Sequence, residues 1–245
     1  MAIRKSEAII LKTRPFRETS LIVDFFTRDF GKVSGLIKGI RNEPQRYGGL
    51  PLIFSHSLIV FYEKLKRELN LVTQCDAREQ FLSIRADLNK THYANYFIEL
   101  LSAVTQSFDK NEGLFELTLD SLNAMAQDAQ NWRIGRIFEI KLLNLSGFKP
   151  RLDACVNCQK EIGAKSKFSS TLGGILCPRC FASDPNAKPA LRGTLASIEH
   201  IEESSWPKAL QLKLSRNIAL ELATILSSFL DVHLEKTINS RKFLN

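Results

Sequence analysis

The first 75 residues alternate short apolar runs with polar turn residues, a pattern typical of β-strands. β-branched and aromatic side chains dominate these runs. We predict five strands, at residues 7–13, 20–27, 32–37, 57–63 and 69–74. Several of them are apolar on both sides, which favours a small closed barrel over an open sheet. The sequence therefore predicts a five-stranded OB-fold β-barrel.

After residue 76 the apolar residues recur at i, i+3, i+4 and i+7, which indicates amphipathic helices. We predict helices at residues 91–106, 115–126, 131–145, 191–202 and 210–229. A loop-rich stretch that contains most of the cysteines interrupts them. The helical domain is therefore expected to be discontinuous, with a cysteine-bearing segment inserted into it.

These patterns predict an α+β multidomain protein. The expected divisions are an OB-fold nucleic-acid-binding domain at 1–78, a helical domain in two parts, and a cysteine-rich insertion between the two parts. The helical parts are predicted at 79–148 and 189–245, and the insertion at 149–188.

Four of the five cysteines form two C-x-x-C pairs, 18 residues apart. Each pair directs two thiolates to one side of a tight turn, so two pairs can close a tetrahedral Zn²⁺ site. Four thiolates leave no open position, which predicts one structural zinc ion and no catalytic one. The predicted ligands are Cys155, Cys158, Cys177 and Cys180. Residues 167–170 and 174–176 between them suit the hairpin of a zinc ribbon.

Two alternatives to zinc use the same cysteines. Two disulfides need an oxidising compartment, and the N-terminus lacks the apolar stretch of a signal peptide. A thioredoxin-type redox pair needs one C-x-x-C in a βαβ context, which the pattern does not provide. No apolar run approaches the roughly 18 residues of a membrane span, so we expect a cytoplasmic protein without membrane contact.

The net charge of +8 suggests an anionic partner. The charge is uneven, at +5 for residues 1–80, −1 for 81–150 and +4 for 151–245. OB barrels bind single strands with a basic groove and stacking aromatic rings. The candidate nucleic-acid-binding residues are Lys12, Arg14, Arg17, Lys38, Arg41, Arg46 and Tyr47. Alternatively, these basic residues lie in solvated loops without a ligand, and Tyr47 packs into the protein.

The sequence contains none of the common catalytic motifs for phosphate loops, dinucleotide binding, zinc proteases or nucleophile elbows. The four histidines fall in different predicted elements without ligand spacing. We therefore expect no enzymatic activity. A zinc-dependent hydrolase would need an open metal position, which four cysteines do not leave.

Five segments occur in a fixed order along the chain, at residues 38–41, 46–50, 147–153, 173–177 and 240–244. Together they resemble the RecO family of bacterial DNA repair and recombination proteins. Gln159 departs from the family pattern, which often has Gly after the first cysteine pair.

The resemblance implies a non-catalytic mediator of homologous recombination, located in the cytoplasm with the bacterial nucleoid. Such a protein binds single- and double-stranded DNA and anneals complementary strands. With RecR it helps to load RecA onto DNA coated by single-stranded-DNA-binding protein. Without the resemblance, the same residues would also suit an RNA-binding OB-fold and zinc-ribbon protein of translation or transcription.

Overall fold

The computed structural model describes residues 2–63, 69–127, 130–163, 165–234 and 236–244. The chain divides into two compact units. The first unit combines Met1–Asn131 with Ile238–Asn245, and the second is Trp132–Thr237. In the described part of the chain, no helix is both long and apolar enough to cross a membrane.

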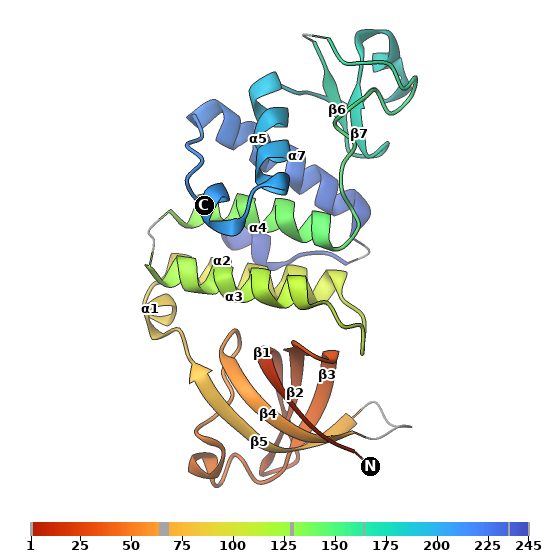
Figure 1. Cartoon of the computed structure of the whole chain (residues 1–245). Helices are drawn as coiled ribbons and strands as arrows, with labels where there is room; N and C mark the ends of the chain where they lie inside the picture. Colours follow the sequence, from red (N-terminus) through yellow and green to blue (C-terminus); the bar gives the residue numbers. More distant parts are fainter. Residues whose placement is uncertain (1, 64–68, 128–129, 164, 235, 245) are drawn as a thin grey trace. The chain divides into compact units, whose positions relative to one another are not determined.

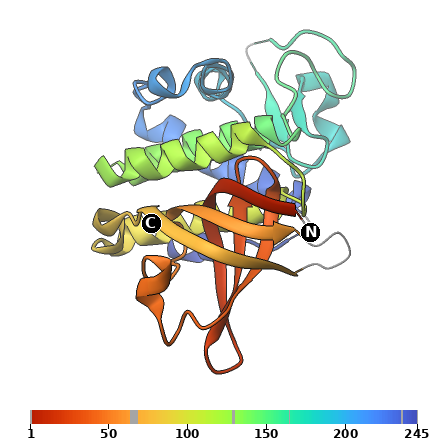
Figure 2. The same cartoon turned by 60° about the horizontal axis from the view of Figure 1, so that its bottom comes forward.

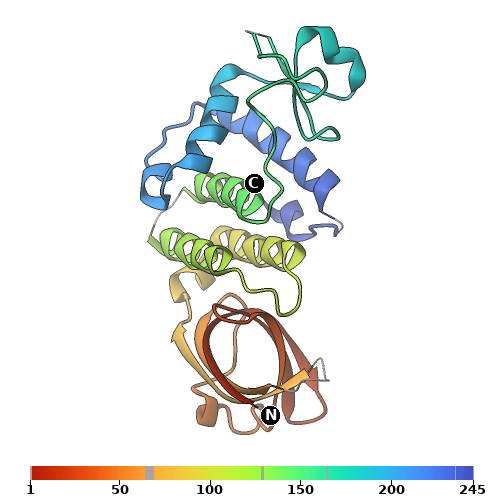
Figure 3. The same ribbon diagram turned by 45° about the vertical axis from the view of Figure 1, so that its right-hand side comes forward.

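The first unit begins with a closed five-stranded barrel in the order β1-β2-β3-β5-β4 (Figure 3). Strands β3 and β5 pair in parallel, and the other pairs are antiparallel. This confirms the predicted barrel. The strands are β1 (Ala2–Phe16), β2 (Ser20–Thr27), β3 (Gly31–Ile37), β4 (His56–Glu63) and β5 (Leu69–Glu79).

The alternating side chains of these strands fill the barrel interior. Strand β1 is longer than predicted because its two halves have different partners. Its first half pairs with β4, and after a register shift between Ile10 and Lys12 its second half continues along β2. The fully buried core residues include Ile10, Phe25 and Val33.

Three helices follow the barrel in the first unit, and α2 and α3 lie together across one end of it (Figure 1). The helices are α1 (Leu82–Arg85), α2 (Leu88–Val104) and α3 (Glu112–Gln127). Helix α2 starts earlier than predicted because the Asp87 side chain caps it by accepting a hydrogen bond from Lys90 N at 3.0 Å.

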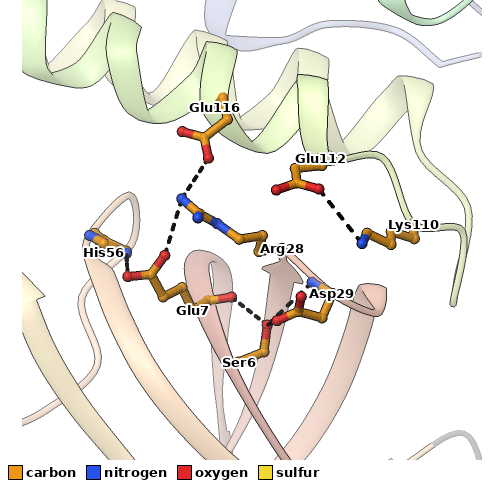
Figure 4. A network of polar contacts seen from close by, with 8 residues as sticks. All are labelled: Ser6, Glu7, Arg28, Asp29, His56, Lys110, Glu112 and Glu116. Atoms are coloured by element: carbon orange, nitrogen blue, oxygen red, sulfur yellow. Dashed lines mark hydrogen bonds and ion pairs between the residues drawn. The ribbon is translucent and has the colours of Figure 1, made fainter.

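A network of charged side chains joins this end of the barrel to α3 (Figure 4). Arg28 Nη2 lies 3.2 Å from Glu7 Oε2 and 2.5 Å from Glu116 Oε1. His56 Nε2 lies 3.7 Å from Glu7 Oε1, and its ring packs edge-on against Phe115. We call this the docked end of the barrel.

The start of strand β3 also lies close to the helices at the docked end. Lys32 Nζ donates hydrogen bonds to the carbonyl oxygens of Ser102 and Thr105 at 2.8 and 3.1 Å, where α2 ends. Phe108 N donates to Lys32 O at 3.0 Å. At Gly31, with φ +64°, a Cβ would lie 2.1 Å from the Asp109 carbonyl oxygen. Glycine is therefore required there.

The C-terminal segment returns to the first unit and packs on α2 as η3 (Ser240–Phe243). Glu99 accepts hydrogen bonds from Asn239 N, Ser240 N and Ser240 Oγ at 3.0, 2.8 and 2.5 Å. Burial tends to raise the pKa of Glu99, but these hydrogen bonds outweigh it and lower the pKa. This basic segment is thus held by α2.

The second unit contains a helical part and a small ribbon of three short strands. Helix α7 begins later than predicted because Ser215 caps it, accepting a hydrogen bond from Ile218 N. The helices are α4 (Asn131–Leu145), α5 (Arg192–Glu203), α6 (Trp206–Ala209) and α7 (Arg216–His233). The ribbon contains β6 (Lys167–Ser169), β7 (Gly174–Leu176), η2 (Pro178–Ser183) and β8 (Lys188–Pro189).

The predicted fold class is confirmed: an N-terminal barrel, helices, and an inserted four-cysteine ribbon. The compact units differ from the four predicted segments, however. The barrel shares its unit with α1, α2, α3 and the C-terminal segment. The docked end joins the barrel to the helices, and Glu99 on α2 holds the C-terminal segment.

Candidate metal centre and nucleic-acid interface

Two tight turns present the four cysteines to one point in the second unit. In the first turn, Gln159 N donates to Cys155 O at 2.8 Å, and Gln159 adopts a left-handed conformation with φ 58°. Glycine adopts a left-handed conformation without strain, which explains why a glycine would also suit position 159. In the second turn, Cys180 N donates to Cys177 O at 2.8 Å.

The sulfur atoms of all four cysteines lie within 4.8 Å of one another, and those of Cys158 and Cys177 are 3.7 Å apart. A disulfide needs about 2.05 Å. Four sulfurs about 2.3 Å from a tetrahedral Zn²⁺ would be roughly 3.8 Å apart. The cluster can therefore hold one metal ion, and all five cysteines are free thiols in the structure.

The surroundings of Cys155 favour the thiolate that a metal needs. Burial tends to raise its pKa, but hydrogen bonds from the backbone N–H groups of Cys177, Cys158 and Asn157 outweigh burial and lower the pKa to about 6. For Cys180, a hydrogen bond from Asn157 acts to lower the pKa, whereas burial and the neighbouring thiols raise it to about 11. A bound cation would relieve this crowding of thiolates.

Five of the six predicted basic residues gather at the end of the barrel opposite the docked end. The registers of β1–β2 and β2–β3 place the turn after Phe16 and the end of β3 there. The loop that follows β3, with η1 (Pro44–Tyr47), starts from the same end (Figure 2). We call this the basic end, and its exposed cations are Arg14, Arg17, Lys38, Arg41 and Arg46.

Backbone contacts bring two of these cations together from distant parts of the sequence. Arg41 N donates to Thr19 O at 2.9 Å, and Arg41 Nη1 lies 3.4 Å from Arg17 O. The loop after β3 is thereby fixed against the β1–β2 turn. The result is a cationic surface built from two segments.

The remaining predicted cation and Arg14 lie beside a carboxylate. Lys12 is exposed on the barrel side, opposite Asp24 in the β1–β2 register. Arg14 Nη2 contacts both Asp24 carboxylate oxygens, at 3.0 and 2.9 Å. Asp24 partly neutralises this part of the surface, so Arg17, Lys38 and Arg41 are the stronger candidates for phosphate contacts. Arg46 also has a carboxylate nearby, since its Nη1 lies 4.0 Å from Glu43 Oε2.

Tyr47 does not offer an exposed ring. Its side chain is part of the barrel core, 6% exposed, and its hydroxyl donates to Lys38 O at 2.9 Å. The prediction of a stacking role for Tyr47 is therefore wrong in this conformation. The ring anchors the basic loop instead.

A more exposed aromatic ring lies at the basic end, and the sequence reading missed it. Phe16 is half-buried at the end of β1, with the Arg17 guanidinium 5.4 Å from its ring centre. Its position between Pro15 and Arg17, just before a turn, is the signal that could have identified it. Phe16 is the better stacking candidate.

Comparisons with known proteins cover nearly the whole chain. Residues 1–81 match the family described as Recombination protein O N terminal, and residues 85–242 match Recombination protein O C terminal. This chain belongs to the RecO family. The family match assigns it a role in DNA repair and recombination.

Curated RecO proteins align along the full length of the chain. A protein named DNA repair protein RecO from Pelotomaculum thermopropionicum is 33% identical over 248 residues, which cover 100% of this chain and 94% of that protein. One with the same name from Symbiobacterium thermophilum is 30% identical and covers 100% and 98% of the two chains. The RecO relationship therefore includes both the barrel and the cysteine ribbon.

Proposed function

We propose that this RecO-family protein is a non-catalytic recombination mediator that binds single- and double-stranded DNA through the basic end of its barrel. It anneals complementary strands and, with RecR, assists RecA loading onto DNA coated by single-stranded-DNA-binding protein. It acts in the cytoplasm, at the nucleoid. The cluster of exposed cations from two fixed segments carries this proposal.

The chemistry of the basic end suits a protein that binds DNA and then transfers it to another protein. Lys and Arg side chains contact phosphates without reading sequence, so the surface can act at any gap. Phe16 adds a ring on which one base can stack, which is equally tolerant of sequence. Because most contacts are electrostatic, the hold on DNA weakens steeply with salt, and strands can be exchanged.

We also propose that the bound metal is zinc, held by Cys155, Cys158, Cys177 and Cys180. Zinc supplies folding free energy to a ribbon whose strands are only two or three residues long. Four thiolates complete the coordination, so the proposed role is structural. Second-unit backbone contacts, such as Val156 N to Ile175 O at 2.9 Å, connect the first cysteine turn to the hairpin.

Strand annealing tests the function directly. Complementary single strands coated with single-stranded-DNA-binding protein are mixed with the wild type or with a variant carrying Lys38→Gln, Arg41→Gln and Arg46→Gln. The matched control carries Lys5→Gln, Lys110→Gln and Lys242→Gln, exposed lysines of the same unit outside the basic end. We expect annealing to slow at least about tenfold in the first variant and less than about twofold in the control.

Two results would contradict the proposal. Equal slowing by both variants would assign DNA handling to net charge rather than to the basic end. Tighter binding of structured RNA than of either DNA form at one salt concentration would favour an RNA-binding protein of translation or transcription.

A further inference from the structure

Two hollows in the second unit join into one groove between the ribbon and α5. Their volumes are about 420 and 600 Å³, and they share Leu152, Asp153 and Glu199. One wall is the segment 149–153, and α5 (labelled in Figure 1) forms another. The third wall comes from the ribbon residues Glu161, Ile162, Gly163, Ser166 and Ile175. Each hollow is within the size range of ligand sites.

The groove is acidic in a protein that is strongly basic overall. Its lining contains more carboxylates than cations, and two of the cations already pair within it: Lys149 with Glu202 at 2.9 Å and Arg151 with Asp153 at 3.1 Å. The carboxylates are Asp153, Glu161, Glu199, Glu202 and Glu203, and the cations are Lys149, Arg151 and Arg192. A DNA phosphate would be repelled here.

Glu202 shows that the groove has an incompletely satisfied acceptor. Its side chain is only 2% exposed, and Glu202 is one of the residues that line the hollow. The half-exposed Lys149 ammonium lies 2.9 Å from Oε2, and Oε1 has no hydrogen-bond partner among the described residues. Burial raises the pKa of Glu202, partly offset by Lys149. A buried acceptor of this kind favours a further donor in the groove.

The chemistry of the lining narrows the class of ligand. Among the described residues, the cysteine cluster is the one group whose ligand atoms converge enough for a metal, so these carboxylates do not form a cation cage. The apolar residues of the lining include Leu152, Ile175 and Leu195, which we call the floor. A ligand that fits both features carries an organic cation and an apolar group.

We propose that this groove binds a short segment of a partner protein in which a Lys or Arg side chain stands beside an apolar one. The cation pairs with Glu199 and Glu203, which are exposed on α5, and donates toward Glu202. The apolar side chain covers the floor. This surface goes beyond DNA handling and does not depend on it.

The experiment uses the full-length, metal-loaded protein on an array of immobilised eight-residue peptides. Each peptide pairs one Lys or Arg with one Leu, Ile or Val at every spacing from one to four residues. Matched peptides replace the cation by Glu or the apolar residue by Ser. The protein is tested as wild type, as Glu199→Gln with Glu203→Gln, and as Glu18→Gln with Glu43→Gln, a control that removes two exposed carboxylates in the first unit.

We expect the wild type to be retained by peptides that have both groups, at least about tenfold more strongly than by either matched set. The α5 variant should lose this preference, and the control should keep it. Retention that is uniform across the array, absent, or unchanged in the α5 variant would overturn the proposal. Equal competition by free spermidine and by the best free peptide would also overturn it, because a polyamine has no apolar side chain for the floor.

Discussion

The two ends of the barrel carry the same kinds of cation and use them in opposite ways. At the docked end, Arg28 is pinned between two carboxylates and Lys32 caps α2. At the basic end, Arg17 and Arg41 are tied through backbone atoms, while their charges remain exposed. The neighbours of a cation, more than its sequence context, decide whether it supports the fold or can meet a ligand.

This contrast explains why the net charge of each sequence segment predicts the position of a DNA-binding surface only coarsely. Arg28 and Lys32 contribute to the +5 of the first 80 residues, yet both are engaged in joining the barrel to the helices. The exposed charge of the basic end, which we propose contacts DNA, is smaller and more local than the total. It is concentrated where two turns meet.

The largest effect should come from removing the metal, and it should spare both barrel ends. We expect about one metal ion per chain, lost in Cys155→Ser, with the ribbon unfolding because metal binding contributes on the order of 10 kcal/mol in small zinc modules. The matched control is Cys75→Ala, since burial raises the pKa of Cys75 to about 12 and the thiol lies in the barrel core.

Metal analysis and hydrogen exchange check this prediction. Protection should be lost in the ribbon and kept in the barrel. A metal-free protein with a fully protected ribbon would show that the cysteines have another purpose.

Two glycine substitutions compare the stability cost of a side chain at the two ends of the barrel. Gly31→Ala at the docked end should cost about 3 kcal/mol or more, because its Cβ would meet backbone atoms of Asp109 in addition to the strain of a left-handed alanine. Gly39→Ala near the basic end has the same strain, with φ +73°, but open space around the Cβ. It should cost only about 1 kcal/mol. Equal losses in urea unfolding would refute the close docking of the barrel on the helices.

Tyr47→Phe tests the anchoring of the basic loop. Loss of the hydrogen bond to Lys38 O should lower the free energy of unfolding by about 1 kcal/mol. Affinity for single-stranded DNA should fall less than in Phe16→Leu, measured at the same salt concentration. A larger DNA defect for Tyr47→Phe would restore Tyr47 as a DNA contact.

A pH dependence of stability is expected at the docked end. Burial lowers the pKa of His56 from its ordinary 6.5, with Glu7 and Glu116 acting to raise it and Arg28 and Arg78 to lower it. The unfolded chain therefore binds the proton first, and the free energy of unfolding should fall as the pH drops below about 6.5 toward the folded pKa. One proton limits the slope to about 1.4 kcal/mol per pH unit.

His56→Gln should flatten this part of the pH profile, and the exposed control His200→Gln should not. Unfolding in urea at several pH values measures both. An unchanged slope in His56→Gln would place the titrating group elsewhere.

Local patterns predicted the elements and the cysteine cluster well, because strands, helices and C-x-x-C turns are short-range features. The five strands and the four cysteines were found from spacing alone. The longer β1 was missed because its extension depends on β4, which lies far along the sequence.

Long-range pairing also decided which candidate site residues are available. Tyr47 reads as an exposed loop aromatic, but the barrel core buries it. The link between Arg41 and the β1–β2 turn has no sequence signature. Likewise, nothing in the sequence indicates that the C-terminal segment donates hydrogen bonds to Glu99 on α2. Such features depend on tertiary contacts, which residue spacing does not encode.

The salt dependence of single-stranded DNA binding tests the central claim, that the basic end is the DNA surface. We compare the slope of log affinity against log salt for the wild type, for Lys38→Gln with Arg41→Gln and Arg46→Gln, and for the control with Lys5→Gln, Lys110→Gln and Lys242→Gln. Each lost phosphate contact should reduce the slope by about 0.7, so the basic-end variant should lose about 2 and the control almost nothing. Equal slopes in all three proteins, or a greater loss in the control, would contradict the account.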